Sequence, residues 1–142
     1  MKIIYEDNGN VCVVHPSNNW TGTMEDLANK IVPKGLHYDI VDDNIIPSDR
    51  TFRNAWKTGA TGVEVDMLKA RELWREKIRQ ARISKFAEND TILQNAIADG
   101  DEKAKSVAIT LRNKLRELPQ DPRIDAAQTP NELKAIWFDE LK

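Results

Sequence analysis

The spacing of apolar residues changes near Asp66, and this change constrains the fold more than any other feature of the 142-residue chain. After Asp66 the apolar residues recur at steps of three and four, which places their side chains on one face of an α-helix. Before Asp66 they occur in short β-branched runs that are typical of strands. The sequence therefore predicts an α+β protein, with strands concentrated before Asp66 and helices after it.

The first third of the chain is expected to form a small β-rich unit. Two β-branched runs, Lys2 to Glu6 and Val11 to His15, are joined by a turn that contains Asn-Gly. Because this pair tolerates the positive φ angles of a tight turn, the runs predict a β-hairpin. A short helix is expected after Thr23, and the alternating residues 36–41 predict a third strand. Residues 1–46 are thus predicted to form a ββαβ unit.

Two amphipathic helices are predicted after Asp66, and they are expected to pack as a hairpin. The apolar stripe of the first comprises Met67, Ala70, Leu73, Trp74, Ile78 and Ala81. The apolar seam of the second comprises Ala104, Val107, Ala108, Leu111, Leu115 and Leu118. This seam is narrow enough to lie along another helix. A separate short helix over residues 91–98 is expected between the two.

A capping box predicts a last helix near the C-terminus. Thr129 precedes Pro130 and stands three residues before Glu132, so its hydroxyl is expected to accept a hydrogen bond from the Glu132 amide while the carboxylate reaches back. Trp137 is expected on the apolar face of this helix. Residues 63–142 are therefore predicted to be a helical hairpin closed by a short, capped terminal helix.

Residues 47–62 are expected to be a hinge loop between the two parts, which together form one compact domain. The loop concentrates aromatic and basic side chains, namely Arg50, Phe52, Arg53 and Trp56. A single helical turn would place Phe52 and Trp56 on one face, because they are four residues apart. We expect this face to dock the β-rich unit onto the helices. The alternative is an exposed aromatic anchor for a partner.

An arginine ridge is predicted on the first long helix, roughly opposite its apolar stripe. It consists of Arg71, Arg75, Arg79 and Arg82. Arginine binds phosphate or carboxylate through paired hydrogen bonds, so the ridge is a candidate site for nucleic acid or an acidic partner. Glu72 and Glu76 flank the ridge and are placed to pair with its arginines. We therefore favour a solvent-exposed face held by salt bridges, with partner binding as the alternative.

The sequence contains no motif for catalysis, for a cofactor or for a metal. Cys12 is the only cysteine, which excludes an internal disulfide and favours a reducing compartment. His15 and His37 are not accompanied by a metal-ligand pattern of carboxylates. Apolar residues make up 40% of the chain, charged residues 31%, and the net charge is -2, as expected for a globular protein without a nucleic-acid surface. No apolar run reaches the roughly 18 residues of a membrane span. We expect a protein that is not an enzyme and needs no cofactor or metal.

Two stretches resemble small proteins encoded near the tail genes of tailed bacteriophages. The segment IPSDRTFRNAW, residues 46–56, resembles a recurrent DDRTFRNAW segment that is followed, as here, by a linker and VDMLKAREL. The segment LRNKLRELPQDP, together with the later LKAIW, resembles the C-terminal pattern of phage tail assembly chaperones and tail fibre assembly proteins. That pattern has a proline after the tryptophan, where this chain has Phe138.

The resemblance implies a non-enzymatic phage protein that assists tail or tail fibre assembly in the host bacterial cytoplasm. Its partner would be a tail or tail fibre protein, and self-association is compatible with the pattern. The candidate partner-binding residues are Arg50, Phe52, Arg53, Trp56, Arg71, Arg75, Arg79, Arg82 and Trp137. One alternative is a minor structural component that stays in the virion. Another is a phage inhibitor of a host enzyme or defence complex that uses the arginine ridge.

Overall fold

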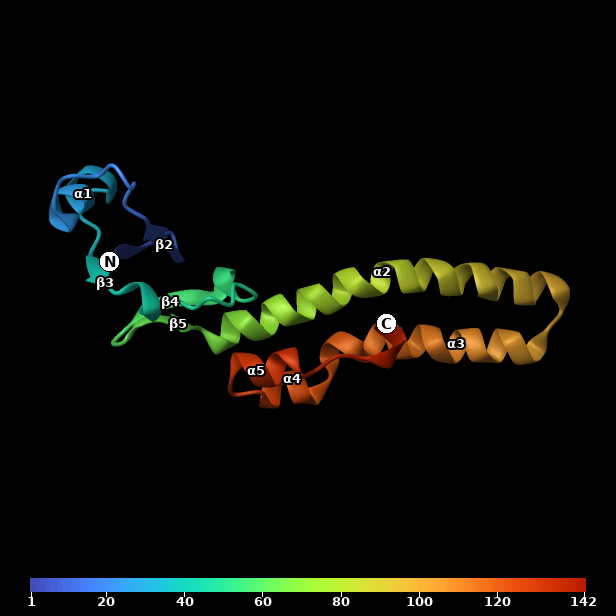
Figure 1. Cartoon of the computed structure of the whole chain (residues 1–142). Coiled ribbons are helices and arrows are strands. Elements are labelled where there is room, and N and C mark those ends of the chain that lie inside the picture. The colour runs from blue at the N-terminus through green and yellow to red at the C-terminus, as the bar shows by residue number, and fades with distance from the viewer. The chain divides into compact units, whose positions relative to one another are not determined.

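The computed structural model describes all 142 residues and shows an α+β protein. The chain divides into two compact units, Met1–Ala70 and Arg71–Lys142. All strands lie in the first unit, and the long helix α2 (Met67–Asp99) begins at the end of that unit and continues into the second (Figure 1). The predicted fold class is therefore confirmed. The two units differ from the single compact domain that the sequence predicted, and the boundary lies within the first turns of α2.

The predicted ββαβ unit is confirmed. Its elements are β1 (Lys2–Asp7), β2 (Asn10–Val14), α1 (Met24–Ile31) and β3 (Tyr38–Val41). The sheet is antiparallel with the order β2-β1-β3, so β1 is the central strand. Asp7 pairs with Asn10 around the turn, and Asn8 and Gly9 have φ angles of 50° and 77°. These positive angles explain why the turn requires Asn-Gly.

Local capping starts α1 at the expected residue. The Asp26 amide donates to Thr23 Oγ1 at 3.0 Å, and the Thr23 amide donates to Asp26 Oδ2 at 3.1 Å. This reciprocal pair satisfies two backbone donors that a helix start would leave without partners. The helix buries Leu27 and Ala28 in a cluster with Ile3 of β1. One face of the central strand is covered in this way.

Residues 47–62 are not the predicted hinge loop. Arg53–Ala55 form a 3-10 turn, and a second hairpin follows, made of β4 (Trp56–Gly59) and β5 (Gly62–Val65). Gly59 and Gly62 are paired with each other at the end of this hairpin. Its strands are short and half polar, so their pattern did not stand out as strands. The hairpin belongs to the first unit, which therefore extends well beyond residue 46.

Trp56 is the centre of the second cluster of the first unit. It is 2% exposed and packs with Ile4, Val11 and Val63. Successive residues of a strand point to opposite faces, so Ile3 contacts the α1 cluster while Ile4 contacts the β4–β5 hairpin. Trp56 thus packs against the sheet of its own unit. Phe52 is 3% exposed, so the alternative of an exposed aromatic anchor is wrong for both residues.

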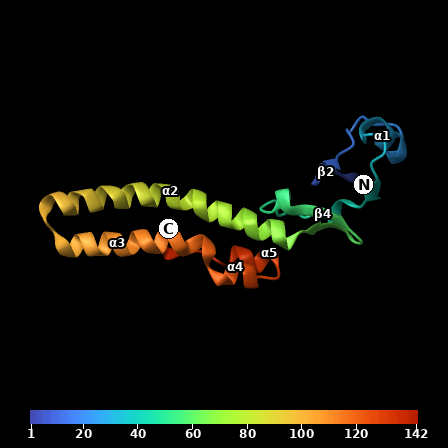
Figure 2. The same cartoon turned by 180° about the vertical axis from the view of Figure 1, so that it is seen from behind.

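The second unit is built on the predicted helical hairpin. The helices α2 and α3 (Glu102–Glu117) run antiparallel and side by side (Figures 1 and 2). Gly100 turns the chain with a φ of 66°, and Asp101 caps α3 by accepting a hydrogen bond from the Ala104 amide at 3.0 Å. The separate helix predicted over 91–98 is wrong, because α2 is one helix of 33 residues. No glycine or proline lies between Asn89 and Thr91 to end it.

The seam between α2 and α3 is partly as predicted. Trp74 and Ile78 of α2 and Ala108 and Leu115 of α3 are buried. The prediction is wrong for Val107, which is 64% exposed. Towards the tip of the hairpin the seam contains a buried polar residue, Asn89. Its Nδ2 donates to the Ala108 carbonyl at 2.8 Å.

The C-terminal segment folds back as short pieces instead of one terminal helix. These pieces are a 3-10 turn (Leu118–Gln120), α4 (Pro122–Ala126), α5 (Pro130–Lys134) and a last 3-10 turn (Asp139–Leu141). The predicted cap is confirmed, since the Glu132 amide donates to Thr129 Oγ1 at 3.2 Å. Glu132 Oε2, however, accepts from the Gln128 amide at 2.6 Å, one residue earlier than in a capping box. Because α5 ends at Lys134, Trp137 lies beyond the helix on which it was expected.

Candidate functional site

A groove of about 750 Å³ lies in the second unit, where the end of α3 meets the C-terminal segment. Three parts of the chain contribute to it: the last turn of α3, the turn leading into α4, and the residues after α5. We call it the aromatic groove. Its lining residues are Lys114, Glu117, Leu118, Gln120, Asp121, Pro122, Arg123, Trp137, Phe138, Asp139 and Glu140.

Two prolines shape the wall of the groove between α3 and α4. Pro119 has no amide hydrogen to continue the helix, so α3 ends at Glu117 and tightens into a 3-10 turn. Pro122 takes the first position of α4, where a missing amide hydrogen costs nothing. Asp121 caps α4 by accepting from the Arg123 amide at 2.9 Å. The chain therefore changes direction sharply at this point and leaves the groove open.

Trp137 lines the groove and contacts the buried residue Trp74 of the core. Its ring packs edge-on against Trp74, with ring centroids 5.8 Å apart and an interplanar angle of 67°. Lys77 Nζ lies 4.7 Å from the Trp74 centroid and 5.9 Å from the Trp137 centroid. Trp74 Nε1 also donates to the Ile136 carbonyl at 2.9 Å, which fixes the backbone beside Trp137. The ring of Trp137 remains half-exposed and is oriented before any partner binds.

The rim of the groove carries paired charges. Lys114 Nζ lies 3.0 Å from Glu140 Oε1. Arg123 binds both carboxylate oxygens of Asp121, at 3.0 and 3.1 Å, and its guanidinium lies 5.5 Å from the Phe138 ring centroid.

These contacts keep the rim carboxylates ionised. The hydrogen bonds from Arg123 lower the pKa of Asp121. A backbone hydrogen bond, with a further contribution from Lys114, lowers the pKa of Glu140. Both groups therefore act at neutral pH as hydrogen-bond acceptors and fixed charges. An aromatic floor with a charged rim is suited to hold a polypeptide segment.

The arginine ridge does not form the solvent-facing surface that the sequence predicted. Arg71 donates from Nε and Nη2 to the Ala127 carbonyl, at 3.2 and 2.7 Å. Arg82 Nη1 donates to the carbonyls of Leu115 and Arg116, both at 3.0 Å. These carbonyls lie at the ends of α3 and α4, where a helix leaves acceptors without intrahelical partners. The two arginines therefore hold the returning chain instead of facing solvent.

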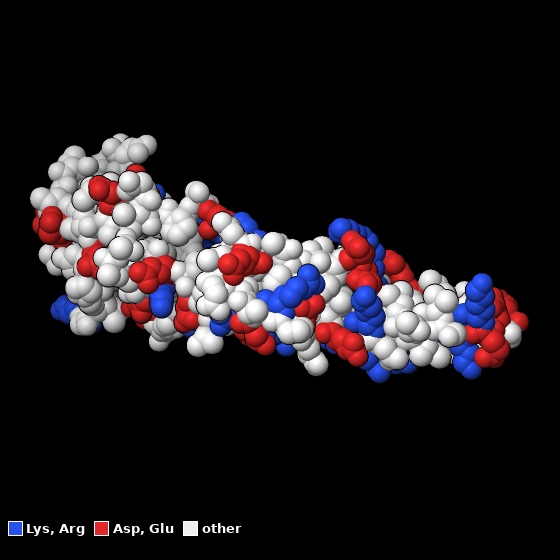
Figure 3. Space-filling model, turned by 90° about the horizontal axis from the view of Figure 1, so that it is seen from below, with Lys and Arg blue, Asp and Glu red and all other residues white.

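Arg75 also holds the returning chain, whereas Arg79 lies on a salt-bridged surface. Arg75 Nε donates to the Pro119 carbonyl at 3.2 Å, and the same side chain pairs with Asp125. Arg79 matches the predicted salt-bridged face, since its Nη1 lies 2.8 Å from Glu72 and 3.3 Å from Glu76. On the face drawn in Figure 3, basic and acidic side chains are interspersed without a large area of one sign.

The basic residues of the 47–62 segment are exposed, but they do not meet the acidic residues that follow β3. Arg50 and Arg53 lie at the surface of the first unit. Asp43 is instead 3.0 Å from the N-terminal ammonium group of Met1. The hydrogen bond from this ammonium group lowers the pKa of Asp43. Of the candidates in this segment, only the two arginines are accessible.

The structure brings together no group of three or more His, Cys, Asp or Glu side chains that could hold a metal ion. His37 Nε2 lies 3.2 Å from Asp39 Oδ1, as an exposed pair. No helix of the protein combines the length and the apolar character needed to cross a membrane.

Sequence reasoning found Trp137 but missed the rest of the groove. Lys114, Arg123 and Glu140 come from separate parts of the chain and show no shared pattern. One signal in the sequence is the pair of prolines on either side of this turn, Pro119 and Pro122, which indicate a sharp change of chain direction. Comparison with known proteins adds no relative, because no family model, curated protein or solved structure matches the chain.

Proposed function

We propose that this chain is a non-enzymatic phage protein that assists tail or tail fibre assembly by binding a virion component. The aromatic groove carries the proposal, because a pre-oriented tryptophan beside charged rim residues is typical of the centre of a protein-binding site. The phage setting rests on the resemblance of residues 46–56 and 111–137. In this proposal the partner is an exposed segment of a tail or tail fibre protein in the host bacterial cytoplasm.

The geometry of Trp137 favours binding for an energetic reason. Its contact with Trp74 and the fixed Ile136 backbone restrict the ring already in the free protein. A partner that covers the exposed part of the ring gains apolar burial while little side-chain freedom is lost. The paired charges at the rim offer hydrogen-bond partners to the backbone of a bound segment.

Co-expression with the tail and tail fibre proteins of the same phage tests the proposal. The wild-type chain should co-purify with one of them and raise its soluble yield. Trp137→Ala should reduce the captured amount by about tenfold or more, as expected for an aromatic residue at the centre of an interface. Trp20→Ala is the matched control, because Trp20 is a half-exposed tryptophan of the first unit.

A second variant separates binding from folding, since Trp137→Ala also removes a core contact. Glu117 is an exposed residue of the groove rim, so Glu117→Lys should leave the melting temperature unchanged and still weaken capture. Wild-type capture by both groove variants would contradict the proposal.

Purified virions distinguish an assembly factor from a structural component. An assembly factor should be absent from the particles, whereas a minor virion protein should be retained in them. The inhibitor alternative relied on a free arginine ridge. Arg71, Arg75 and Arg82 donate to backbone carbonyls of their own chain, so no observation favours it.

A further inference from the structure

We propose that the outer face of α3 docks an amphipathic helix whose apolar centre is flanked by acidic residues. The face is defined by Lys103, Val107, Thr110 and Lys114, which we call the α3 stripe. Steps of four, three and four residues keep these positions on one side of the helix. A shallow apolar groove of about 400 Å³ lies along it, lined by Ser106, Val107, Thr110, Leu111 and Lys114.

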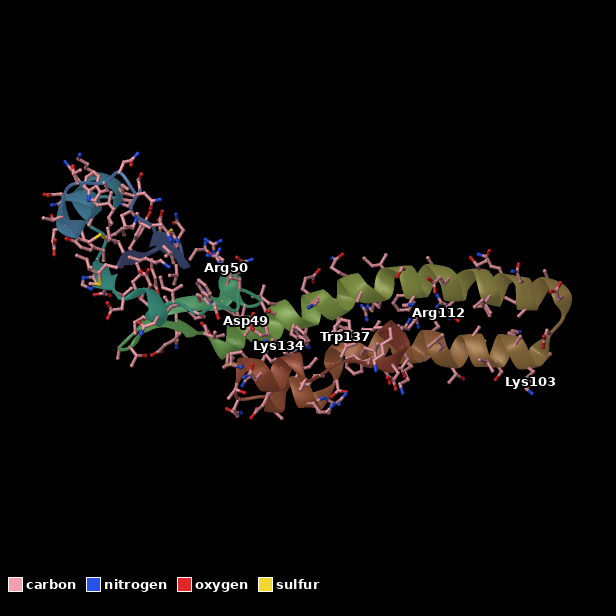
Figure 4. The ribbon with its side chains drawn as sticks, in the orientation of Figure 1. Asp49, Arg50, Lys103, Arg112, Lys134 and Trp137 are labelled. Atoms are coloured by element: carbon pink, nitrogen blue, oxygen red, sulfur yellow. The ribbon has the colours of Figure 1, made fainter.

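The centre of the α3 stripe, Val107 and Thr110, is not covered by the rest of the chain. Ala108 and Leu115 are the buried residues of α3, at 1% and 0% exposure, whereas Val107 is 64% exposed. Lys103 extends from the side of α3 that faces away from α2 (Figure 4). Thr110 Oγ1 donates to the Ser106 carbonyl at 3.0 Å, so its hydroxyl is satisfied locally. The centre of the stripe is therefore mainly apolar.

The charges on the stripe define the chemistry of the partner. The two lysines are eleven residues apart, which corresponds to about 16 Å along a helix. Lys103 is exposed, and the Lys114 side chain stays 59% exposed although it pairs with Glu140. Glu102, which precedes Lys103 in the chain, lies on another face of the helix and is 4.0 Å from Lys105. Two acidic residues eleven positions apart on a partner helix would meet both lysines.

A second copy of this stripe does not fit. Its spacing of four, three and four is the same in both directions, so a facing copy of α3 places lysine opposite lysine in either orientation. Like charges at such short range oppose association. The occupant is therefore a different helix with acidic ends.

The α3 stripe is continuous with the aromatic groove, because Lys114 lines both. One end of a helix bound on the stripe would therefore lie next to the groove that contains Trp137. The inference rests on the proposed function for its natural partner, and it adds the secondary structure and charge of the segment that binds.

A pair of synthetic helical peptides tests the inference on the full-length protein. Both carry leucines at positions i+4 and i+7 in an alanine-glutamine background. One has glutamates at i and i+11, and the other has lysines there. Fluorescence anisotropy should show about tenfold tighter binding of the glutamate peptide, since two ion pairs are replaced by two repulsions.

Three variants give the decisive comparisons. Lys103→Glu should reverse or remove the preference for the glutamate peptide. Val107→Asp should abolish binding of both peptides, because it places a charge in the apolar centre. Arg112→Glu is the matched control, since Arg112 is an exposed cation of α3 outside the stripe, and this variant should bind like the wild type.

Equal binding of the two peptides, or wild-type binding by Val107→Asp, would overturn the inference. The same variants separate it from the proposed function. A tail protein whose capture survives Lys103→Glu and Val107→Asp would refute the stripe and leave the groove proposal intact. Selective peptide binding by a chain that captures no tail or tail fibre protein would support the stripe and reject the proposed function.

Discussion

Individual charged side chains stabilise this protein by binding backbone groups that would otherwise lack partners. Arg71 and Arg82 donate to carbonyls of the returning chain, and Glu6 accepts from the Thr58 amide at 2.6 Å and from Thr58 Oγ1 at 2.9 Å. Hydrogen bonds that involve a charged group are stronger than neutral ones. At the scale of the residue, these contacts connect positions that are far apart in the chain.

Glu6→Gln should make the protein less stable at neutral pH. The Thr58 amide, followed by the Thr58 hydroxyl, lowers the pKa of Glu6 from its ordinary value of 4.5. The carboxylate therefore stabilises the folded state fully above the ordinary pKa, and this contribution is lost as the pH falls through the lowered pKa. Denaturation at several pH values should show a wild-type advantage that disappears in acid. A difference independent of pH would show that the charge of Glu6 plays no part.

Gly62→Ala should destabilise the β4–β5 hairpin. Gly62 has a φ of 114°, a backbone angle that residues other than glycine rarely adopt. An added Cβ would also overlap Ile45 Cγ2. The strain and the overlap together should lower the free energy of unfolding by about 1 to 3 kcal/mol. Gly35→Ala is the control, since Gly35 has a φ of 90° but open space around it, and should cost less. Urea unfolding measures both, and equal losses would show that Ile45 moves aside.

At the scale of elements, a buried polar contact joins the two helices of the α2–α3 hairpin. Asn89 is 3% exposed, and its amide bonds to the Ala108 carbonyl between the two helices. Small residues, Ala96 and Ala108, fill the remaining buried positions near the tip. A seam with so few large side chains has little to fix the alignment of its helices. The Asn89 contact therefore sets the register of the hairpin, as a single buried asparagine does in coiled coils.

Asn89→Asp should destabilise the hairpin strongly. The carboxylate would be buried against a carbonyl oxygen without a donor, and an uncompensated buried charge costs about 3 to 5 kcal/mol. Asn95→Asp is the matched control, because Asn95 is an exposed asparagine of the same helix. Thermal unfolding should show a large loss only for Asn89→Asp, and the loss should shrink in acid, where the aspartate is neutral. A loss unaffected by acid would point to packing instead of charge.

The whole molecule contains two cores, one in each compact unit. The first is built around Ile3, Ile4 and Trp56, and the second includes Ile78 and Leu115. Because the two sets of side chains lie in different units, damage to one core should first affect the unit that contains it. The molecule is thus expected to open in parts.

Leu115→Ala and Ile4→Ala test this expectation. Each removes a fully buried aliphatic side chain and should cost about 2 to 5 kcal/mol in its own unit. Hydrogen exchange should accelerate mainly in residues 71–142 for Leu115→Ala and mainly in residues 1–70 for Ile4→Ala. Val107→Ala, at an exposed position of α3, should change neither pattern. Uniform acceleration by either core variant would show that the two units unfold together.

The sequence by itself determined the features that depend on neighbouring residues. The Asn8-Gly9 turn, the Thr23 cap and the Thr129 cap were all predicted, because their hydrogen bonds and backbone angles involve residues only a few positions apart. Helical periodicity likewise predicted α2 and α3, although the continuous course of α2 through Asn89 was missed.

Only the tertiary structure decided which side chains of these elements are buried, which bind distant backbone groups and which are exposed. Trp56 is buried by Ile4 and Val11, the Thr58 amide binds a carboxylate 52 positions away, and Arg71 reaches a carbonyl 56 positions away. The aromatic groove likewise exists only where three distant segments meet. Such contacts produce no periodic pattern in the sequence, because each depends on where the chain folds back. A side chain then forms a hydrogen bond with an unsatisfied backbone group that the folded chain has placed nearby.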